Sequence, residues 1–177
     1  MPRPRSFALP LLWLGAALLV AAVVAYAVGV RFTLTPSVPR GFYVQTDDAV
    51  EVGRLVTFCP PEDVAAYALE RGYLHRGSCP GGVEPLGKYV LAVEGDTVTL
   101  SEEGVQVHGR AVSNSAVYAR DVVGRELPHY AFGAHVVGED SLFVFSGHHP
   151  RSFDSRYFGP VPESSVRDVL RPLWTFD

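Results

Sequence analysis

The segment from Phe7 to Val30 constrains the fold most, because it contains no charged residue over roughly two dozen positions. A helix rises about 1.5 Å per residue, so this run can cross the ~30 Å hydrocarbon core of a bilayer. We therefore expect a transmembrane helix over residues 7–30, after a short tail over 1–6 and before one further domain over 31–177.

Two other interpretations of this run stay open. Ala25-Tyr26-Ala27 has the A-x-A form of a signal-peptide cleavage site, and Arg3 and Arg5 make a basic start. However, the apolar run is longer than the ~7–15 residues of a signal-peptide core and continues past that site. A buried core helix is disfavoured because no face of the run is polar. Arg31 and Arg40 follow the apolar run closely, so the distribution of positive charge does not determine the orientation of the helix in the membrane.

Charge and cysteine content limit the partners and the compartment. The net charge is −4, and no Lys or Arg cluster could neutralise phosphates, so we expect no nucleic-acid partner. Cys59 and Cys79 are the only cysteines. A disulfide between them would close a loop of about twenty residues, stabilise the fold by about 3 kcal/mol and favour an oxidising compartment. The spacing also allows two buried thiols in a reducing compartment.

The rest of the chain predicts a mainly β domain. Short runs rich in Val, Tyr, Phe and Thr, bounded by Gly, Asp or Pro, predict strands over 41–45, 53–58, 87–93, 95–100, 104–110 and 140–147. One helix is predicted over 61–72, with Gly72 as its C-cap. It lies between the cysteines, so 59–79 forms a small inserted cap. We also expect a turn or short helix over 164–170, ended by Pro172.

The stretch from Arg31 to Gly41 is a short linker interrupted by Pro36 and Pro39, which exclude a helix and favour extended backbone before them. We therefore expect Ser37 on an extended segment. Seven residues separate it from Val30, a span of at most ~25 Å. Ser37 is thus expected near the bilayer surface.

Lys88 is an unexpected residue in an apolar strand. Alternation places Leu86, Val90 and Ala92 on its face, and both faces of the strand look buried. Burial disfavours the charged ammonium and lowers its pKa. A neutral lysine amine can take the proton of a serine hydroxyl, which is a weak nucleophile without a base. The alternative is an edge lysine whose ammonium reaches water.

A third polar cluster follows the strand 140–147. Ser152, Asp154, Ser155 and Arg156 crowd into a few positions of SGHHPRSFDSRYFGPVP, over 146–162. Asp154 and Arg156 could form an ion pair that holds another polar group in place. The alternative is an ordinary surface loop with a salt bridge of little energetic value.

Three stretches, TPSVPRGFY, GKYVLAVEGDTV and SGHHPRSFDSRYFGPV, resemble in order and spacing the conserved boxes of type I signal peptidases. These are membrane-anchored serine proteases that use a Ser-Lys dyad. The compact length and single anchor look most like the conjugative-transfer branch, the TraF-type peptidases that mature prepilins. The resemblance covers the chain from the anchor to about Pro162 and implies a mainly β, signal-peptidase-like catalytic core.

The resemblance also implies roles for individual residues. Ser37 would be the acylating nucleophile and Lys88 the general base, while the Thr35 hydroxyl and the Ser37 backbone N–H would form the oxyanion hole. Ser152 would orient the lysine. Asp154 and Arg156 would brace the site, and the aspartate position is implicated more directly in function in the conjugative branch.

By the same resemblance, the partners would be the lipid bilayer and a membrane-inserted precursor, a prepilin or a preprotein. The precursor would carry small residues such as alanine before the cut and bind as an extended strand. The domain would lie on the periplasmic face of a bacterial inner membrane and need no cofactor. Maturation in this branch can end in head-to-tail cyclisation. A general signal peptidase and a non-enzymatic anchored assembly protein are the other hypotheses.

Some residues depart from the family pattern. Tyr89 replaces the arginine that often follows the lysine, and residues 147–150 replace a G-D-N-R-type run. His148 and His149 could be metal ligands, but no further ligands stand at suitable spacing, so we expect no metal. A histidine-based triad is disfavoured because no G-x-S-x-G elbow accompanies any serine.

Overall fold

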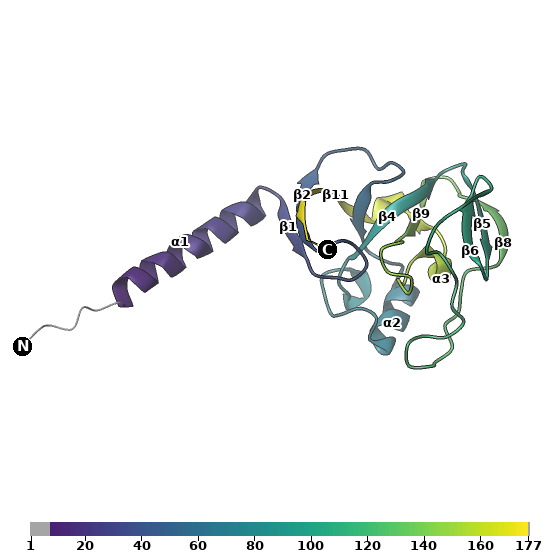
Figure 1. The fold of residues 1–177 in the computed structure, drawn as a ribbon, viewed down its shortest axis with the longest axis horizontal. Coiled ribbons are helices and arrows are strands. Elements are labelled where there is room, and N and C mark those ends of the chain that lie inside the picture. Colours follow the sequence, from purple (N-terminus) through teal and green to yellow (C-terminus); the bar gives the residue numbers. More distant parts are fainter. Residues whose placement is uncertain (1–7, 177) are drawn as a thin grey trace, which may run out of the picture.

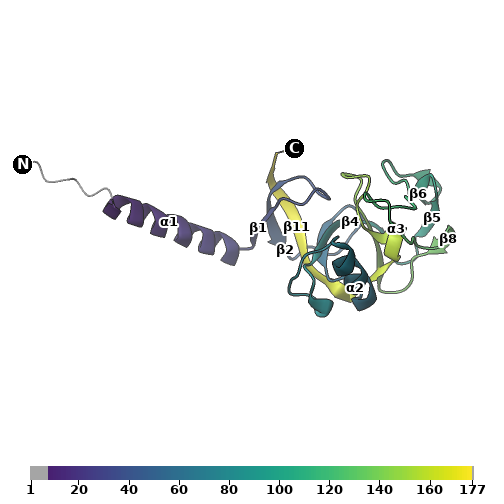
Figure 2. The same cartoon turned by 90° about the horizontal axis from the view of Figure 1, so that it is seen from below.

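The computed structural model describes residues 8–176, and in it an isolated N-terminal helix precedes a β domain (Figure 1). Helix α1 (Ala8–Ala27) projects away from the domain in two perpendicular views (Figures 1 and 2). Its segment Leu9–Ala27 is 0% buried, so it is not a core helix and is a candidate membrane span or signal sequence. The predicted tail, with Arg3 and Arg5, and Phe7 lie outside the described residues.

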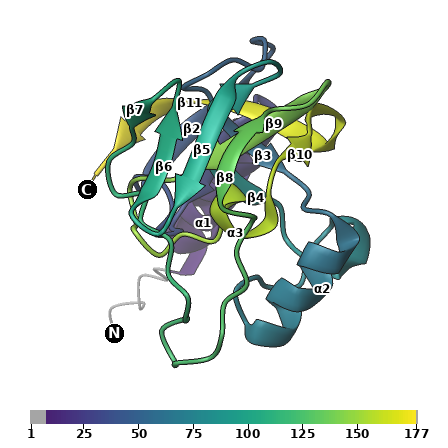
Figure 3. The ribbon, with the colours of Figure 1, turned by 90° about the vertical axis from the view of Figure 1, so that its right-hand side faces the viewer.

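The prediction of a mainly β fold is confirmed. A seven-stranded antiparallel sheet has the order β1-β2-β11-β3-β4-β9-β10. The strands are β1 (Val30–Thr33), β2 (Gly41–Thr46), β3 (Leu55–Phe58), β4 (Leu86–Val93), β9 (Ser141–Phe145), β10 (Val161–Pro162) and β11 (Val166–Thr175). A second sheet has the order β7-β6-β5-β8 and contains β5 (Thr97–Ser101), β6 (Gly104–Val107), β7 (Arg110–Ala111) and β8 (Gly133–Val136) (Figure 3).

Strand β9 connects the two main hydrophobic cores because its side chains alternate between them. Leu142 and Val144 pack into the core beneath the large sheet, together with Phe58. Phe143 points the other way, into a core formed largely by the second sheet, which includes Leu100. The alternation fixes the register of β9 against β4 and thus the position of residues that follow β9.

Helix α2 (Glu62–Arg71) lies within the insertion, as predicted, and Gly72 ends it with φ +71°. Ala65 and Ala68 are its fully buried residues. Cys59 and Cys79, which bound the insertion, are joined by a disulfide, and the 3₁₀ turn η1 (Pro80–Gly82) directly follows it. The insertion is thereby closed at its base and packs against the sheet.

Several local predictions are wrong, including the single strand expected over 104–110, which is instead the antiparallel pair β6 and β7. Of the turn or short helix expected over 164–170, only a 3₁₀ turn, η2 (Glu163–Ser165), forms. The rest belongs to β11, because this segment pairs on both sides, with β2 and with β3. Pro172, expected to end a helix, lies at a register shift of β11, where a missing backbone N–H is tolerated. Ser37 lies in a turn with Pro36 and not on extended backbone.

Candidate active site

Ser37 and Lys88 come from different parts of the large sheet and meet at its surface. Ser37 follows the edge strand β1, and its turn is held by buried Val38 and by the Tyr43 hydroxyl, which donates to the Pro39 carbonyl at 2.5 Å. Lys88 lies in β4. Its Nζ is 2.9 Å from Ser37 Oγ, within hydrogen-bond distance.

Lys88 is only 2% exposed, so the alternative of an edge lysine whose ammonium reaches water is wrong. The predicted alternation of β4 is confirmed on its face, where Leu86, Val90 and Ala92 are buried, whereas the opposite face is only half-buried. Burial lowers the pKa of Lys88 from 10.5 to about 8, with the negative charge of Asp154 opposing this effect and the Arg156 charge adding to it. A substantial fraction of the amine is therefore neutral near pH 8.

Two further serines contact Ser37. Ser152 Oγ lies 3.2 Å from Ser37 Oγ, so within the Ser37–Lys88 pair the contact of Ser152 is with the serine hydroxyl. Ser146, directly after β9, donates its hydroxyl to the Ser37 carbonyl oxygen. Ser146 was not singled out from the sequence; the available signal was a small hydroxyl residue directly after the apolar run Leu142–Phe145.

Asp154 and Arg156 form a buried ion pair behind Ser146 and Ser152. Both side chains are 0% exposed, and Arg156 Nε donates to Asp154 Oδ1 at 2.8 Å, so the interpretation as a surface salt bridge is wrong. Arg156 also donates to the Ala116, Pro150 and Ser152 carbonyls. Asp154 Oδ2 in turn accepts a hydrogen bond from the Ser146 N–H at 3.3 Å. The pair therefore fixes the loops that carry both site serines.

Asp154 itself contacts Ser146 and Arg156, one layer behind the Ser37–Lys88 pair. It also caps the short helix α3 (Ser155–Phe158), because its side chain accepts from the Arg156 N–H. Ser155 Oγ accepts from the Val144 N–H at 2.9 Å, which ties α3 to β9. The run S-F-D-S-R is thus a structural unit that positions Ser152.

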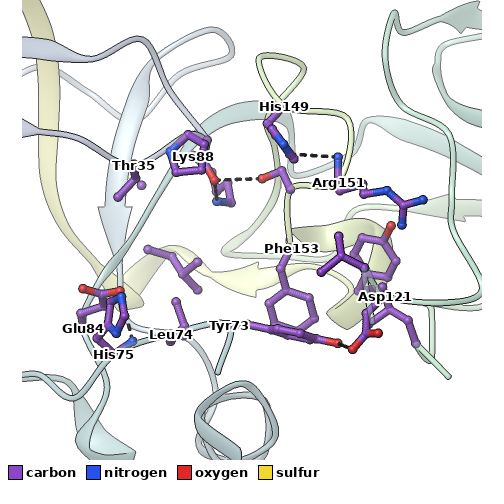
Figure 4. A pocket seen from close by; sticks show the side chains of 18 of the residues that line it. Thr35, Tyr73, Leu74, His75, Glu84, Lys88, Asp121, His149, Arg151 and Phe153 are labelled. Atoms are coloured by element: carbon purple, nitrogen blue, oxygen red, sulfur yellow. Dashed lines mark hydrogen bonds between the residues drawn. The ribbon is translucent and has the colours of Figure 1, made fainter. Parts of the chain in front are cut away.

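Thr35, the expected oxyanion donor, is exposed at the same cleft as Ser37 (Figure 4). Its Oγ1 lies 3.2 Å from Thr33 Oγ1. The Thr35 hydroxyl can rotate toward a ligand, because the Thr33 hydroxyl that it would leave can then hydrogen-bond to solvent. His149 also lines the cleft, but among residues 8–176 no group of three or more His, Cys, Asp or Glu could hold a metal ion.

The cleft has a volume of about 550 Å³ and is lined on one side by residues 34–37, which directly follow β1, and on another by Leu86–Lys88 of β4. Strand β1 is the outermost strand of the large sheet. Strand β4 pairs with β9 only from Tyr89 onward, so Leu86–Lys88 have no β9 partner. An extended peptide between residues 34–37 and Leu86–Lys88 could hydrogen-bond to backbone groups there, with the carbonyl carbon of its scissile bond beside Ser37.

A mainly β domain with a serine in a cleft beside a buried lysine is an arrangement suited to a serine peptidase. The family described as "Signal peptidase, peptidase S26" matches residues 5–174. The chain therefore belongs to the signal peptidase S26 family, which confirms the resemblance noted from the three sequence stretches.

Individual relatives show which members of this family the chain is similar to. It is 41% identical over 163 residues to plasmid transfer protein TraF of Escherichia coli, covering 92% of each protein. It is 44% identical over 167 residues to conjugal transfer protein TraF of Agrobacterium tumefaciens (strain 15955), covering 92% of this chain and 93% of that protein. A solved signal peptidase I from Enterococcus faecalis matches 71% of this chain and 100% of its own, with 18% identity and a TM-score of 0.42.

Proposed function

We propose that the protein is a membrane-anchored serine endopeptidase that uses Ser37 and Lys88 to cleave leader peptides from membrane-inserted precursors such as conjugative prepilins. The observation that carries this proposal is the buried Lys88 Nζ, 2.9 Å from Ser37 Oγ in an open cleft. Membership in the signal peptidase S26 family supports the reaction class, and the names of the TraF relatives support the conjugative setting.

In the proposed first step, Ser37 Oγ attacks the carbonyl carbon of the scissile bond while neutral Lys88 takes the hydroxyl proton. The Ser37 backbone N–H and the Thr35 hydroxyl donate to the developing oxyanion, an interaction whose loss typically costs about 10²–10³ in rate. The ammonium of Lys88 then gives its proton to the leaving amine. The leader remains bound to Ser37 as an ester.

The acyl-enzyme is released by a second nucleophile that Lys88 deprotonates. Water gives the linear leader and product. When the ester carries the segment destined for the product, attack by that segment's own amino group gives a cyclic chain instead, with the loss of one water relative to the linear form. Asp154 and Arg156 act as positioning residues in both steps, because they fix the loops of Ser146 and Ser152.

Helix α1 would anchor the catalytic domain close to the bilayer. It contains 20 residues, a length of about 30 Å, which matches a hydrocarbon core. Ser37 follows the helix closely and stays within reach of the point where the apolar segment of a precursor leaves the membrane. The disulfide between Cys59 and Cys79 supports placement on the oxidising, periplasmic side of the inner membrane.

The experiment that tests the proposal is the processing of a co-expressed prepilin by wild type, Ser37→Ala and Lys88→Met, read by intact mass. We expect processing by wild type only. Ser164→Ala, an exposed serine far along the chain, serves as the matched control and should process normally. Membrane fractionation and protease resistance verify insertion and folding of each variant.

Normal processing by Ser37→Ala or Lys88→Met would overturn the dyad and favour a non-enzymatic assembly protein. The same assay separates the two enzymatic hypotheses. A conjugative peptidase should process the prepilin and leave unrelated secretory preproteins uncut, whereas a general signal peptidase should process both. A product mass one water below that of the linear chain would identify cyclisation.

A further inference from the structure

The cleft does not end at the Ser37–Lys88 pair but continues past Ser152 toward the insertion. Its far part is formed by Tyr73, Leu127, Phe153 and Tyr157, which we call the aromatic compartment. Figure 4 shows the rings of Phe153 and Tyr73 next to each other, with the Tyr73 hydroxyl directed to Asp121. Tyr73 belongs to the disulfide-closed insertion, so this segment, which lies between Ser37 and Lys88 in the sequence, forms part of the cleft wall.

The rings of the aromatic compartment hold one another in place. The centroid of Phe153 lies 5.3 Å from that of Tyr73 and 5.9 Å from that of Tyr157. Tyr67 of helix α2 packs behind them, 6.1 Å from Tyr73 and 6.2 Å from Phe153, and does not belong to the cleft lining. Contacts of this kind position the aromatic surface before any ligand binds.

The polar groups around the compartment already interact with one another. The Tyr73 hydroxyl donates to Asp121 Oδ2 at 2.7 Å, and Arg125 Nε donates to the same oxygen at 2.6 Å. Burial, together with the Asp121 hydrogen bond, raises the pKa of Tyr73 to about 12, so the phenol stays neutral. The guanidinium of Arg151 stacks over Tyr118, 4.2 Å from its centroid. The compartment therefore presents mainly apolar surface to a ligand.

The same interactions attach the loop that closes the compartment to the insertion. Arg125 also donates to the Arg71 carbonyl at 3.0 Å, and Arg71 donates to the Glu126 carbonyl at 3.0 Å. Figure 3 shows the long loop between β7 and β8 running down beside α2. Leu127 is placed in the cleft wall by this attachment.

The compartment lies close to the reacting serine. Ser152 Oγ is 3.2 Å from Ser37 Oγ, and Phe153 is the next residue, with consecutive Cα atoms about 3.8 Å apart. An extended substrate advances about 3.3 Å per residue. A side chain within about three residues of the scissile bond can therefore reach the compartment.

We propose that the aromatic compartment binds one large apolar side chain of the precursor, aromatic or similar in size to leucine, within three residues of the scissile bond. This inference rests on the proposed peptidase function and extends it. Small residues at the cut, expected from the family resemblance, would leave this apolar surface uncovered. The insertion and the loop that carries Leu127 would then select substrates without taking part in the chemistry.

The test uses the full chain in detergent and a set of prepilin-derived peptides. In these peptides, alanine or phenylalanine stands at each of the three positions on either side of the cut. For wild type we expect one position at which phenylalanine raises kcat/KM by at least about tenfold over alanine, the range that a hydrophobic pocket supplies. In Tyr73→Ala we expect this ratio to fall below about threefold.

Tyr67→Ala is the matched control, because it removes a ring of the same cluster that does not line the cleft. It should retain the wild-type ratio even if it lowers activity on all peptides equally. Leu127→Trp fills the compartment without weakening the packing of the insertion, and should also remove the preference. It keeps the test decisive if Tyr73→Ala folds poorly.

A flat peptide scan in wild type would overturn the proposal, as would a preference that survives both Tyr73→Ala and Leu127→Trp. An equal loss of the ratio in Tyr67→Ala would overturn it too, because the effect would then reflect the stability of the cluster. Ser37→Ala separates this result from failure of the peptidase proposal. Peptide cleavage that persists in Ser37→Ala refutes Ser37 as the nucleophile and with it the proposed peptidase mechanism, whereas Ser37-dependent cleavage with a flat scan refutes only the proposed role of the compartment.

Discussion

Titration of Lys88 is the property from which the sharpest prediction can be worked out. Lys88 is the only lysine of the chain, and the other basic residues are arginines and histidines. Arginine cannot be deprotonated under working conditions, so a chain that needs a neutral amine must use lysine for it. Protein labelled with ¹³C at the lysine ε-carbon therefore gives a single side-chain lysine resonance whose shift follows this one group.

We expect that resonance to titrate near pH 8, because burial lowers the pKa from 10.5 to about 8. This change corresponds to about 3 kcal/mol against the charged form. The neutral fraction then rises about tenfold between pH 7 and pH 9, and kcat/KM should rise in parallel. A titration near 10.5, or an activity that stays flat over this range, would refute the assignment of Lys88 as the base.

Stability should follow the same titration. Below pH 8 both the folded and the unfolded chain hold the lysine proton, so the full cost of burying the charge is present. Between about 8 and 10.5 the folded state releases the proton while the unfolded state keeps it, so the free energy of unfolding rises with pH. In Lys88→Met this rise should be absent. Denaturant unfolding of both proteins at pH 7 and pH 10 measures the difference.

Three further sets of substitutions test the residues behind the Ser37–Lys88 pair and the disulfide. Asp154→Asn removes the charge that raises the pKa of Lys88, so we expect the pH midpoint of activity to fall below that of wild type. It also leaves Arg156 without its ion-pair partner, so the free energy of unfolding, measured by denaturation, should fall by about 3–5 kcal/mol. Ser146→Ala should lower kcat by about tenfold to a hundredfold with KM unchanged, because the Ser37 carbonyl loses its donor; Ser146→Thr should restore part of the rate. Replacing both Cys59 and Cys79 by serine should cost about 3 kcal/mol of stability, and a wild-type midpoint would contradict this expectation.

Much of the fold could be predicted from local sequence patterns. The strand around Lys88 and helix α2 were predicted because they combine clear periodicity with glycine or proline boundaries. Strand β11 was not, because its consecutive buried residues, Val169 and Leu170, and its Pro172 show no alternation. That strand exists because β2 and β3 provide partners on both sides, and such partners lie more than a hundred residues away in the chain.

The candidate site, too, could be predicted from the sequence only in part. Ser37 and Lys88 could be proposed from residue types that are chemically unusual for their positions, and the family resemblance joined them. The contribution of Ser146 required coordinates, because nothing local indicates that its hydroxyl donates to the Ser37 carbonyl. The aromatic compartment required them as well, since Tyr73 and Phe153 are eighty residues apart in the sequence and meet only when the insertion packs beside the cleft.

The most direct test of the central claim is detection of the acyl-enzyme. The full chain is mixed with precursor, quenched in acid, which protonates Lys88 and stops deacylation, and analysed by intact and peptide mass spectrometry. The account predicts an ester on Ser37 that adds the mass of the bound acyl segment less one water, and no such adduct in Ser37→Ala. Active turnover with no covalent adduct, or an adduct on another residue, would contradict it.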